Sequence, residues 1–139
     1  MISIRFGQIF KAPAISIPRL GIINLHSGLL PAYKGVMASF WSLLNGESHL
    51  GTTLHWVTDS KIDSGQMISQ RSQTVQTDLS YSEQVLALYE PGVEQILEAV
   101  AHIETLARQS KEDLPKGSYY SFPEAAHLDA FAQAGWILF

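Results

Sequence analysis

Two polar residues, Asn24 and His26, lie at the end of an otherwise apolar run over residues 20–25. Residues two positions apart on a β-strand point to the same side, so both side chains can face one pocket. An imidazole exchanges a proton near neutral pH, and an amide can donate a hydrogen bond to a developing oxyanion. Pro31 and Gly35 bracket the loop that follows. This spacing predicts chemistry at the tip of a strand.

Two further polar residues can complete this group. His55 lies within an apolar and Thr-rich run, and Asp63 precedes Gly65 in a polar loop. A carboxylate near an imidazole stabilises the charged ring and raises its pKa. With Asn24 and His26, these residues are suited to acid–base chemistry and to oxyanion stabilisation, but they identify no reaction by themselves.

Each of these residues also has a purely structural interpretation. Asn24 can be a turn residue, His26 and His55 can be hydrogen-bonded core histidines, and Asp63-x-Gly65 matches a common turn. A metal site built from His26, His55 and Asp63 is a weak alternative, because no His-x-x-x-His spacing accompanies them. We therefore expect no metal.

The composition limits the classes of function. The chain has 139 residues, 46% of them hydrophobic, a net charge of -4 and no cysteine. These values predict one globular domain, argue against a nucleic-acid backbone as the main partner, and exclude disulfides and thiolate chemistry. No apolar run reaches the roughly 18 residues of a membrane helix. We expect a protein of the cytoplasm that does not contact a membrane.

Alternating and β-branched patterns predict strands, which we expect over residues 2–6, 21–26, 51–58 and 66–75. Strands separated by helical patterns indicate an α/β fold with a mostly parallel sheet, in which ligands bind beyond the carboxyl ends of the strands.

Helical patterns occupy the rest of the chain. Met37, Phe40, Trp41 and Leu44 have helical spacing. A capping box at Ser80 starts a longer pattern, which Pro91 should kink or split. In its second half the apolar face is expected to consist of Val93, Ile96, Leu97, Val100, Ile103 and Ala107.

The end of the chain has a different organisation. Residues 109–118 form a polar linker, and a short helix then begins near residues 121–124 and ends at Gly135. The last four residues are apolar enough to dock. We therefore divide the chain into a domain over residues 1–108 and a linker with a short docking helix over residues 109–139.

The pattern Asn24-x-His26-x-x-x-Leu30-Pro31-x-Tyr33-x-Gly35 resembles the active-site signature of the 10-formyltetrahydrofolate-dependent formyltransferases. That family includes glycinamide ribonucleotide, methionyl-tRNA and sugar N-formyltransferases. The segments from Gly51 to Val57 and from Ile62 to Gln70 are similar to two further segments of the family, in the same order. The tail from Tyr119 to Pro123 is also similar to a segment of some members. The resemblance implies the C-terminal half of a Rossmann-like domain.

The resemblance also implies a reaction. Asn24, His26 and Asp63 take the places of the family's catalytic residues. An amine would attack the formyl carbon of 10-formyltetrahydrofolate, and Asn24 and protonated His26 would stabilise the oxyanion of the tetrahedral intermediate. Asp63 would keep His26 charged and help to remove the amine proton. A formyltetrahydrofolate hydrolase is a variant of this expected function, because that enzyme uses similar residues.

Binding roles follow from the same resemblance. Gln8, Ile9 and Phe10, with Asp59 and Ile62 of the 59–65 loop, resemble the cofactor pocket, and His55 and Gly28 are expected on the substrate side. Gly28 occupies a place where the family often has Ser.

The family's preceding βαβα half has no counterpart in this sequence, which begins within an expected strand. We therefore expect an exposed sheet, covered by a second copy in a homo-oligomer or by another chain. A truncated product and an inactive remnant that binds folate or another protein are alternatives. The acidic charge and the lack of a C-terminal tRNA-binding pattern argue against a nucleic-acid acceptor. A nucleotide-linked sugar and a small phosphorylated amine are the remaining candidates.

Overall fold

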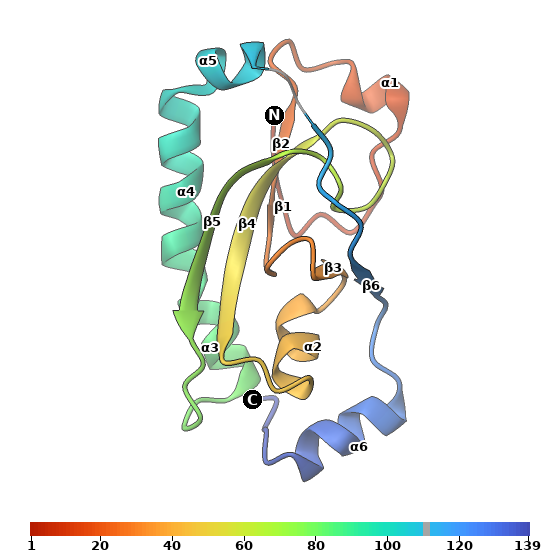
Figure 1. Ribbon diagram of the computed structural model, residues 1–139, viewed down its shortest axis with the longest axis vertical. Coiled ribbons are helices and arrows are strands. Elements are labelled where there is room, and N and C mark those ends of the chain that lie inside the picture. The colour runs from red at the N-terminus through yellow and green to blue at the C-terminus, as the bar shows by residue number, and fades with distance from the viewer. Residues whose placement is uncertain (110–111) are drawn as a thin grey trace.

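The computed structural model describes residues 1–109 and 112–139 and confirms the α/β class. Its main sheet has the strand order β1-β2-β4-β5 (Figure 1). The strands span Ile2–Ile4 (β1), Ile22–His26 (β2), His49–Val57 (β4) and Met67–Thr74 (β5). Thus β1 and β5 are the edges, and the strand that carries Asn24 and His26 lies inside the sheet.

The strand directions divide the sheet into two parts. β1 and β2 run parallel, as the sequence predicted, whereas β4 runs antiparallel to both β2 and β5. The expected parallel character therefore does not extend to β4 and β5. Parallel neighbours need a crossover of about a dozen residues or more, and residues 58–66 are too few to provide one. Between β2 and β4, the chain turns back through α2 (Ala38–Leu44) below the end of β2 (Figure 1).

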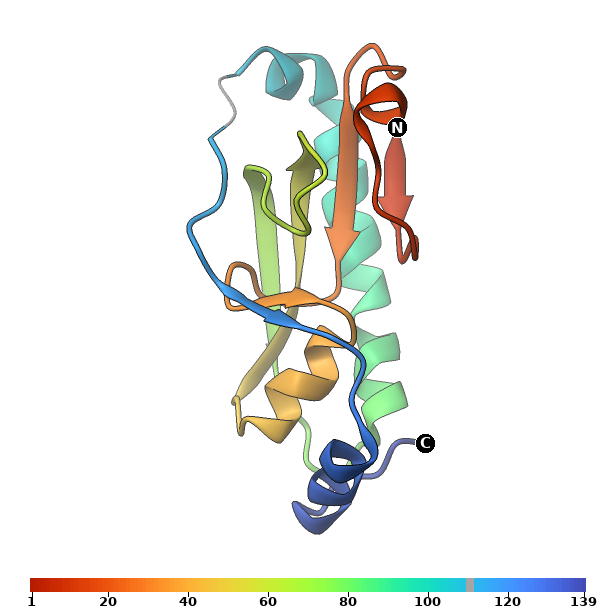
Figure 2. The same cartoon turned by 90° about the vertical axis from the view of Figure 1, so that its right-hand side faces the viewer.

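A second, smaller sheet joins the middle of the chain to its C-terminal segment. β3 (Tyr33–Gly35) pairs in parallel with β6 (Ser118–Tyr120), and Figure 2 shows this pair crossing in front of the main sheet. Beyond β6, α6 (Ala125–Gln133) packs against α2. The expected docking of the last residues is confirmed, because Tyr81 N–H donates to the Ile137 carbonyl and Ser82 N–H to that of Leu138.

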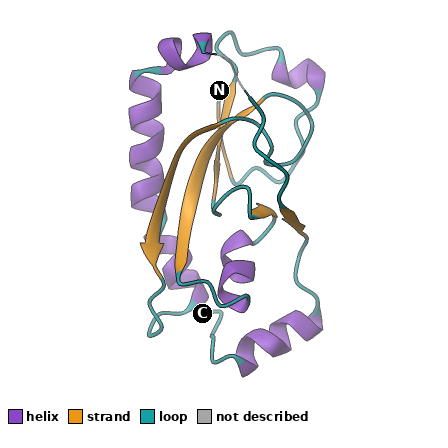
Figure 3. Cartoon of the chain, in the orientation of Figure 1, coloured by secondary structure: helices purple, strands orange, loops and turns teal. Residues whose placement is uncertain are grey.

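The remaining helices are short except for α4 (Figure 3). They are α1 (Ala12–Ile15), α3 (Tyr81–Ala87), α4 (Tyr89–Ala101) and α5 (Ile103–Arg108). The capping box at Ser80 is present. The helix divides at Leu88, so that Pro91 lies in the first turn of α4, where its missing N–H leaves no hydrogen bond unmade.

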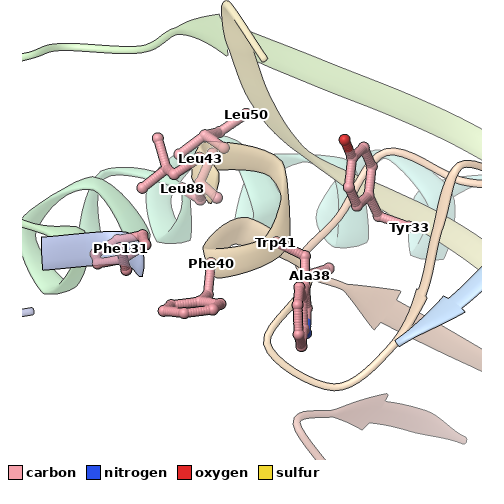
Figure 4. Packing of buried hydrophobic residues seen from close by; sticks show 8 residues of the cluster. All are labelled: Tyr33, Ala38, Phe40, Trp41, Leu43, Leu50, Leu88 and Phe131. Carbon is pink, nitrogen blue, oxygen red and sulfur yellow. The ribbon is translucent and has the colours of Figure 1, made fainter. Parts of the chain in front are cut away.

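Two buried clusters hold these elements together. One surrounds α2, where Phe40 and Phe131 of α6 stack with ring centroids 4.4 Å apart; Figure 4 shows its members. The other lies between the sheet and α4 and includes Ile23, Leu54 and Ile96. The C-terminal segment thus contributes to the core. Ser110 and Lys111 of the expected linker lie outside the described residues.

The apolar face predicted for α4 is only partly buried. Ile96 and Ala99 pack against the sheet, but Val93, Leu97 and Val100 are exposed. β1 has an open edge, and the exposed Ile2 and Ile4 lie beside Ile23 and Leu25 of β2, on the side of the sheet that α4 covers. We call the residues Ile2, Ile4, Val93, Leu97 and Val100 the β1–α4 surface. Within the described residues, no helix is long and apolar enough to cross a membrane.

Candidate active site

One large cavity, of about 530 Å³, lies where β2 ends and where the loop after β4 folds back. Most residues singled out from the sequence line it, namely Gln8, Ile9, Phe10, Asn24, His26, His55, Asp59, Ile62 and Asp63. The fold thus brings together three segments that are far apart in the sequence.

Asn24 and His55 lie directly opposite each other on the neighbouring strands β2 and β4. The His55 Nδ1–H donates to the Trp56 carbonyl at 2.9 Å. In the neutral ring Nε2 is therefore the acceptor, and it receives a hydrogen bond from Asn24 Nδ2 at 3.1 Å. This contact fixes the orientation of the amide.

His26 has its two ring nitrogens in different environments. Nε2 lies 2.6 Å from the Tyr33 carbonyl, and since a carbonyl only accepts, Nε2 carries the proton. Nδ1 lies 3.4 Å from Asp63 Oδ2. The loop after β2 therefore selects the tautomer, and the nitrogen next to the carboxylate is left to exchange a proton.

Asp63 lies between the two imidazoles. Its Oδ2 accepts the Gly35 N–H at 2.8 Å, and its Oδ1 lies 3.5 Å from His55 Nε2. The Asp63 backbone has a φ of 47°, in the left-handed region that Asp tolerates better than most residues. Asp63 is therefore both a turn residue and a part of the candidate site, because the turn places its carboxylate between His26 and His55.

Burial determines the charge of His26. The side chain is 8% exposed, and its desolvation lowers the pKa from 6.5 despite the opposing effect of Asp63. Burial therefore has a larger effect on the pKa of His26 than the carboxylate has, and it favours the neutral ring in the free protein. Burial also acts to raise the pKa of Asp63, but His55, His26 and the Gly35 N–H together lower it below 3.8. Near neutral pH the pair is a neutral imidazole beside a carboxylate.

The residues expected to bind the cofactor form an apolar wall with polar margins. Phe6 stacks on Phe10 with ring centroids 5.0 Å apart, and Ile9 and Ile62 are exposed to the cavity. Asp59 Oδ1 accepts the Lys61 N–H at 2.8 Å. Exposed apolar side chains at a cavity are suited to a planar, partly apolar ligand.

Gly28 is the one site residue predicted from the sequence that does not line the cavity. It is buried below His26, where a Cβ atom would lie 2.7 Å from His26 Nε2 and 2.5 Å from the Ala38 Cβ. The absence of a side chain lets the start of α2 pack against the imidazole. Gly28 thus packs against His26, and its expected place on the substrate side stays a prediction.

Sequence reasoning missed the residues that hold the loop after β2. Thr53 Oγ1 donates to the Gly28 carbonyl at 2.7 Å and accepts the Leu30 N–H at 3.1 Å. Gln70 Nε2 donates to the Leu30 carbonyl at 3.0 Å and to Thr53 Oγ1 at 2.8 Å. Thr53 lies two residues before His55, on the same side of the strand, and this spacing was the available signal.

Sequence reasoning also missed the site position of Tyr119 and Phe122, which line the cavity from β6 and the turn after it. The signal was the aromatic pair beside Tyr120 and Pro123 in an otherwise polar tail. Among the described residues there is no group of three or more His, Cys, Asp or Glu side chains that could hold a metal ion.

Comparison with known proteins identifies relatives of this chain. The model of the formyl transferase family matches residues 1–100. Methionyl-tRNA formyltransferase of Ruminiclostridium cellulolyticum is 32% identical over 115 residues, which are 81% of this chain and 36% of that protein. The corresponding protein of Geobacter metallireducens is 34% identical over 115 residues, 81% of this chain and 37% of its own length. The chain thus spans little more than a third of the curated relatives that it matches.

Solved structures of similar fold include sugar N-formyltransferases. The sugar 3N-formyltransferase WlaRD, determined with dTDP and 5-N-formyl-THF, is 27% identical with a TM-score of 0.71, over 86% of this chain and 43% of WlaRD. PseJ of Anoxybacillus kamchatkensis, in complex with UDP-4,6-dideoxy-4-formamido-L-AltNAc and tetrahydrofolate, is 26% identical with a TM-score of 0.74, over 97% of this chain and 70% of PseJ. With the family model covering most of the sequence, the chain belongs to the formyl transferase family.

Proposed function

We propose that this chain transfers a formyl group from 10-formyltetrahydrofolate to an amine. The observation that carries the proposal is the position of the Asp63 carboxylate, 3.4 Å from His26 Nδ1 and 3.5 Å from His55 Nε2, whose partner is Asn24. These groups line one cavity that is large enough for an organic ligand. Membership of the formyl transferase family supports the assignment.

The folate co-substrate would supply the formyl group, whose carbonyl carbon is open to attack by an amine. Ile9, Phe10 and Ile62 would contact its apolar ring surfaces, and Gln8 and Asp59 offer polar groups at the cavity margin. The exposed apolar lining fits such a group. WlaRD and PseJ were determined with 5-N-formyl-THF and tetrahydrofolate, which supports a folate in this cavity.

The residues divide the chemistry between them. His26 Nδ1 is unprotonated in the free protein and can accept the proton that the attacking amine loses. The imidazolium that forms is stabilised by Asp63 at 3.4 Å. The N–H of the Asn24 amide that His55 does not accept could then donate a hydrogen bond to the negatively charged oxygen. The charged His26, whose N–H groups face the Tyr33 carbonyl and Asp63, would stabilise that oxygen by its charge. Proton transfer to His26 would thus create a positive charge as the oxyanion forms. Collapse of the intermediate would then break the bond between the formyl carbon and N10 of the folate, and His26 would return its proton to N10, so that tetrahydrofolate leaves.

The acceptor is proposed to be an amine on a nucleotide-linked sugar, with a small phosphorylated amine as the other option. The nucleotides bound to WlaRD and PseJ support the first. The net charge of -4 disfavours a nucleic-acid acceptor.

We propose the cytoplasm as the site of action.

Tetrahydrofolate release from 10-formyltetrahydrofolate, followed with and without candidate amines, tests the proposal. We expect release that depends on an amine, and His26→Ala and Asp63→Ala should abolish it without unfolding the protein. His102→Ala is the matched control, because His102 is exposed and outside the cavity lining. Release without any amine would indicate the hydrolase variant. A folded wild-type protein that binds folate and releases nothing would refute the enzyme assignment.

A non-catalytic module that binds folate is the second candidate, and the β1–α4 surface favours it. Ile2, Ile4, Val93, Leu97 and Val100 are apolar and exposed, beside an open strand edge that can pair with a second copy. This candidate predicts a homo-oligomer without turnover. Sedimentation velocity of the wild type and of Leu97→Glu measures it, and an active monomer would exclude it.

A further inference from the structure

We propose that Tyr119 and Phe122 form an aromatic platform on which a planar ring of the acceptor stacks. This inference rests on the proposed function, since it assigns the acceptor side of the same cavity. The two side chains come from the C-terminal segment, whereas the groups proposed for chemistry and for folate come from residues 8–63. The platform is therefore a separate part of the cavity lining.

The first support is the position of Tyr119 next to the catalytic carboxylate. β6 pairs with β3 so that Lys34 lies opposite Tyr119 and Gly35 opposite Tyr120. The Gly35 N–H donates to Asp63 Oδ2 at 2.8 Å. A Cβ atom on Gly35 would lie 2.8 Å from Tyr119 Cε2, so the ring passes over this glycine. The Tyr119 ring therefore lies against Gly35, the residue whose N–H binds the Asp63 carboxylate.

The second support is the alternation of side chains along β6. Tyr120 turns inward and stacks on Tyr33 and Trp41, with ring centroids 5.3 Å and 5.1 Å apart. Its neighbour Tyr119 must point to the opposite side, and it is 58% exposed. Phe122 is 70% exposed and lines the same cavity. Tyr120 is thus packed in the core, whereas Tyr119 and Phe122 are exposed and line the cavity.

The third support is the rigidity of the backbone between the two rings. Trp41 Nε1–H donates to the Ser121 carbonyl at 3.0 Å, and Val36 N–H donates to the Tyr120 carbonyl at 3.0 Å. Pro123 follows Phe122 and restricts its backbone to extended conformations. Exposed rings on a fixed backbone lose little freedom when a ligand stacks on them.

Exposed aromatic faces bind planar rings by stacking, and they tolerate changes in the substituents of the ring. The ligand chemistry that fits is a heteroaromatic ring linked to the amine-bearing part of the acceptor, as a pyrimidine base is in a sugar nucleotide. The base would rest on Tyr119 and Phe122, and the amine would reach toward Asp63 and His26. Such a platform would select the acceptor without taking part in proton transfer.

Isothermal titration calorimetry with unreactive probes tests the platform, because it measures the affinity for each probe. The probes are uridine 5′-diphosphate and thymidine 5′-diphosphate, which carry no amine, and 5-formyltetrahydrofolate for the folate side. We expect the wild type to bind a nucleotide, Tyr119→Ala and Phe122→Ala to bind it about tenfold more weakly, and both variants to keep the wild-type affinity for 5-formyltetrahydrofolate. Phe139→Ala is the matched control, since Phe139 is 93% exposed and outside the cavity lining.

Two conservative variants separate stacking from folding. Tyr119→Phe keeps the aromatic face and should bind the nucleotide as the wild type does, whereas Tyr119→Leu keeps bulk without the face and should behave like Tyr119→Ala. A wild type that binds folate but neither nucleotide would overturn the platform alone. The platform would also be overturned if Tyr119→Ala and Phe122→Ala lost affinity for 5-formyltetrahydrofolate while they retained affinity for the nucleotides. Failure of the wild type to bind folate would instead refute the proposed function.

Discussion

Two walls of the cavity differ in how they are held. The polar wall, formed by Asn24, His26, His55 and Asp63, is largely buried and is fixed by contacts with backbone carbonyls, a backbone N–H and neighbouring side chains. The aromatic wall, formed by Tyr119 and Phe122, is more than half exposed and depends on a three-residue pairing of β3 with β6. The proposed chemistry would thus rest on β2, β4 and the loop after β4, and the proposed recognition of the acceptor would rest on β6 and the residues after it.

The largest effect is expected for the polar wall. Asp63→Asn keeps the size of the side chain but removes the charge that stabilises an imidazolium at His26. We expect kcat for formyl transfer to fall by about 100- to 10,000-fold, with little change in affinity for 5-formyltetrahydrofolate. Steady-state kinetics and titration measure the two quantities. A kcat within a few fold of the wild type would remove Asp63 from the mechanism.

The second effect concerns the anchor of the aromatic wall. Phe131 is 1% exposed and stacks on Phe40, so Phe131→Ala should leave a cavity between α6 and α2. We expect the free energy of unfolding to fall by about 3–5 kcal/mol, as for other buried Phe residues. Urea denaturation measures it. Phe139→Ala should change it by about 0.5 kcal/mol or less, and a similar loss in both variants would show that α6 is not anchored through Phe131.

The third prediction concerns Gly35, which connects the two walls because it pairs with Tyr120 and binds Asp63. Gly35 has a φ of 97°, and a Cβ there would lie 2.2 Å from the Tyr120 carbonyl oxygen. Gly35→Ala should therefore separate β6 from β3, at a cost of about 1–3 kcal/mol in stability, and weaken nucleotide binding. Gly46→Ala is a control with a φ of 76° and open space around it. If Gly35→Ala weakens nucleotide binding no more than Gly46→Ala does, the two walls are independent.

The smallest effect is the pH dependence of stability that His26 causes. Burial lowers its pKa in the folded state below 6.5, so the unfolded chain binds more protons as the pH falls through this value. We expect the free energy of unfolding to decrease from pH 7 toward lower pH, and less so in His26→Gln. The lowered pKa of Asp63 has its effect near and below pH 3.8, where its carboxylate takes up a proton in the unfolded chain first. A wild-type stability that rises on acidification would show that His26 is charged in the folded protein.

Local features of the sequence predicted much of the fold and the polar wall. The strand ending in Asn24-x-His26, the capping box at Ser80 and the loop with Asp63 are present because short-range spacing and turn chemistry determine them. The clustering of the cavity residues required three segments to meet, and there the prediction depended on a family resemblance.

Features that depend on the surroundings could not be predicted. The charge of His26 depends on its burial, which outweighs the nearby carboxylate. The exposure of Val93, Leu97 and Val100 depends on which side of α4 meets the sheet. The position of Tyr119 and Phe122 at the cavity depends on the pairing of β6 with β3, which is distant in the sequence.

The β3–β6 ladder has a consequence for folding. It joins residues near position 34 to residues near position 119, a contact of high sequence separation that gains little until the chain between has folded. Such a contact forms late and opens early, and only three residue pairs support it. Amide hydrogens of β6 should therefore exchange before those of β2 and β4. The wall proposed to choose the acceptor would be assembled last, around a catalytic centre that is already in place.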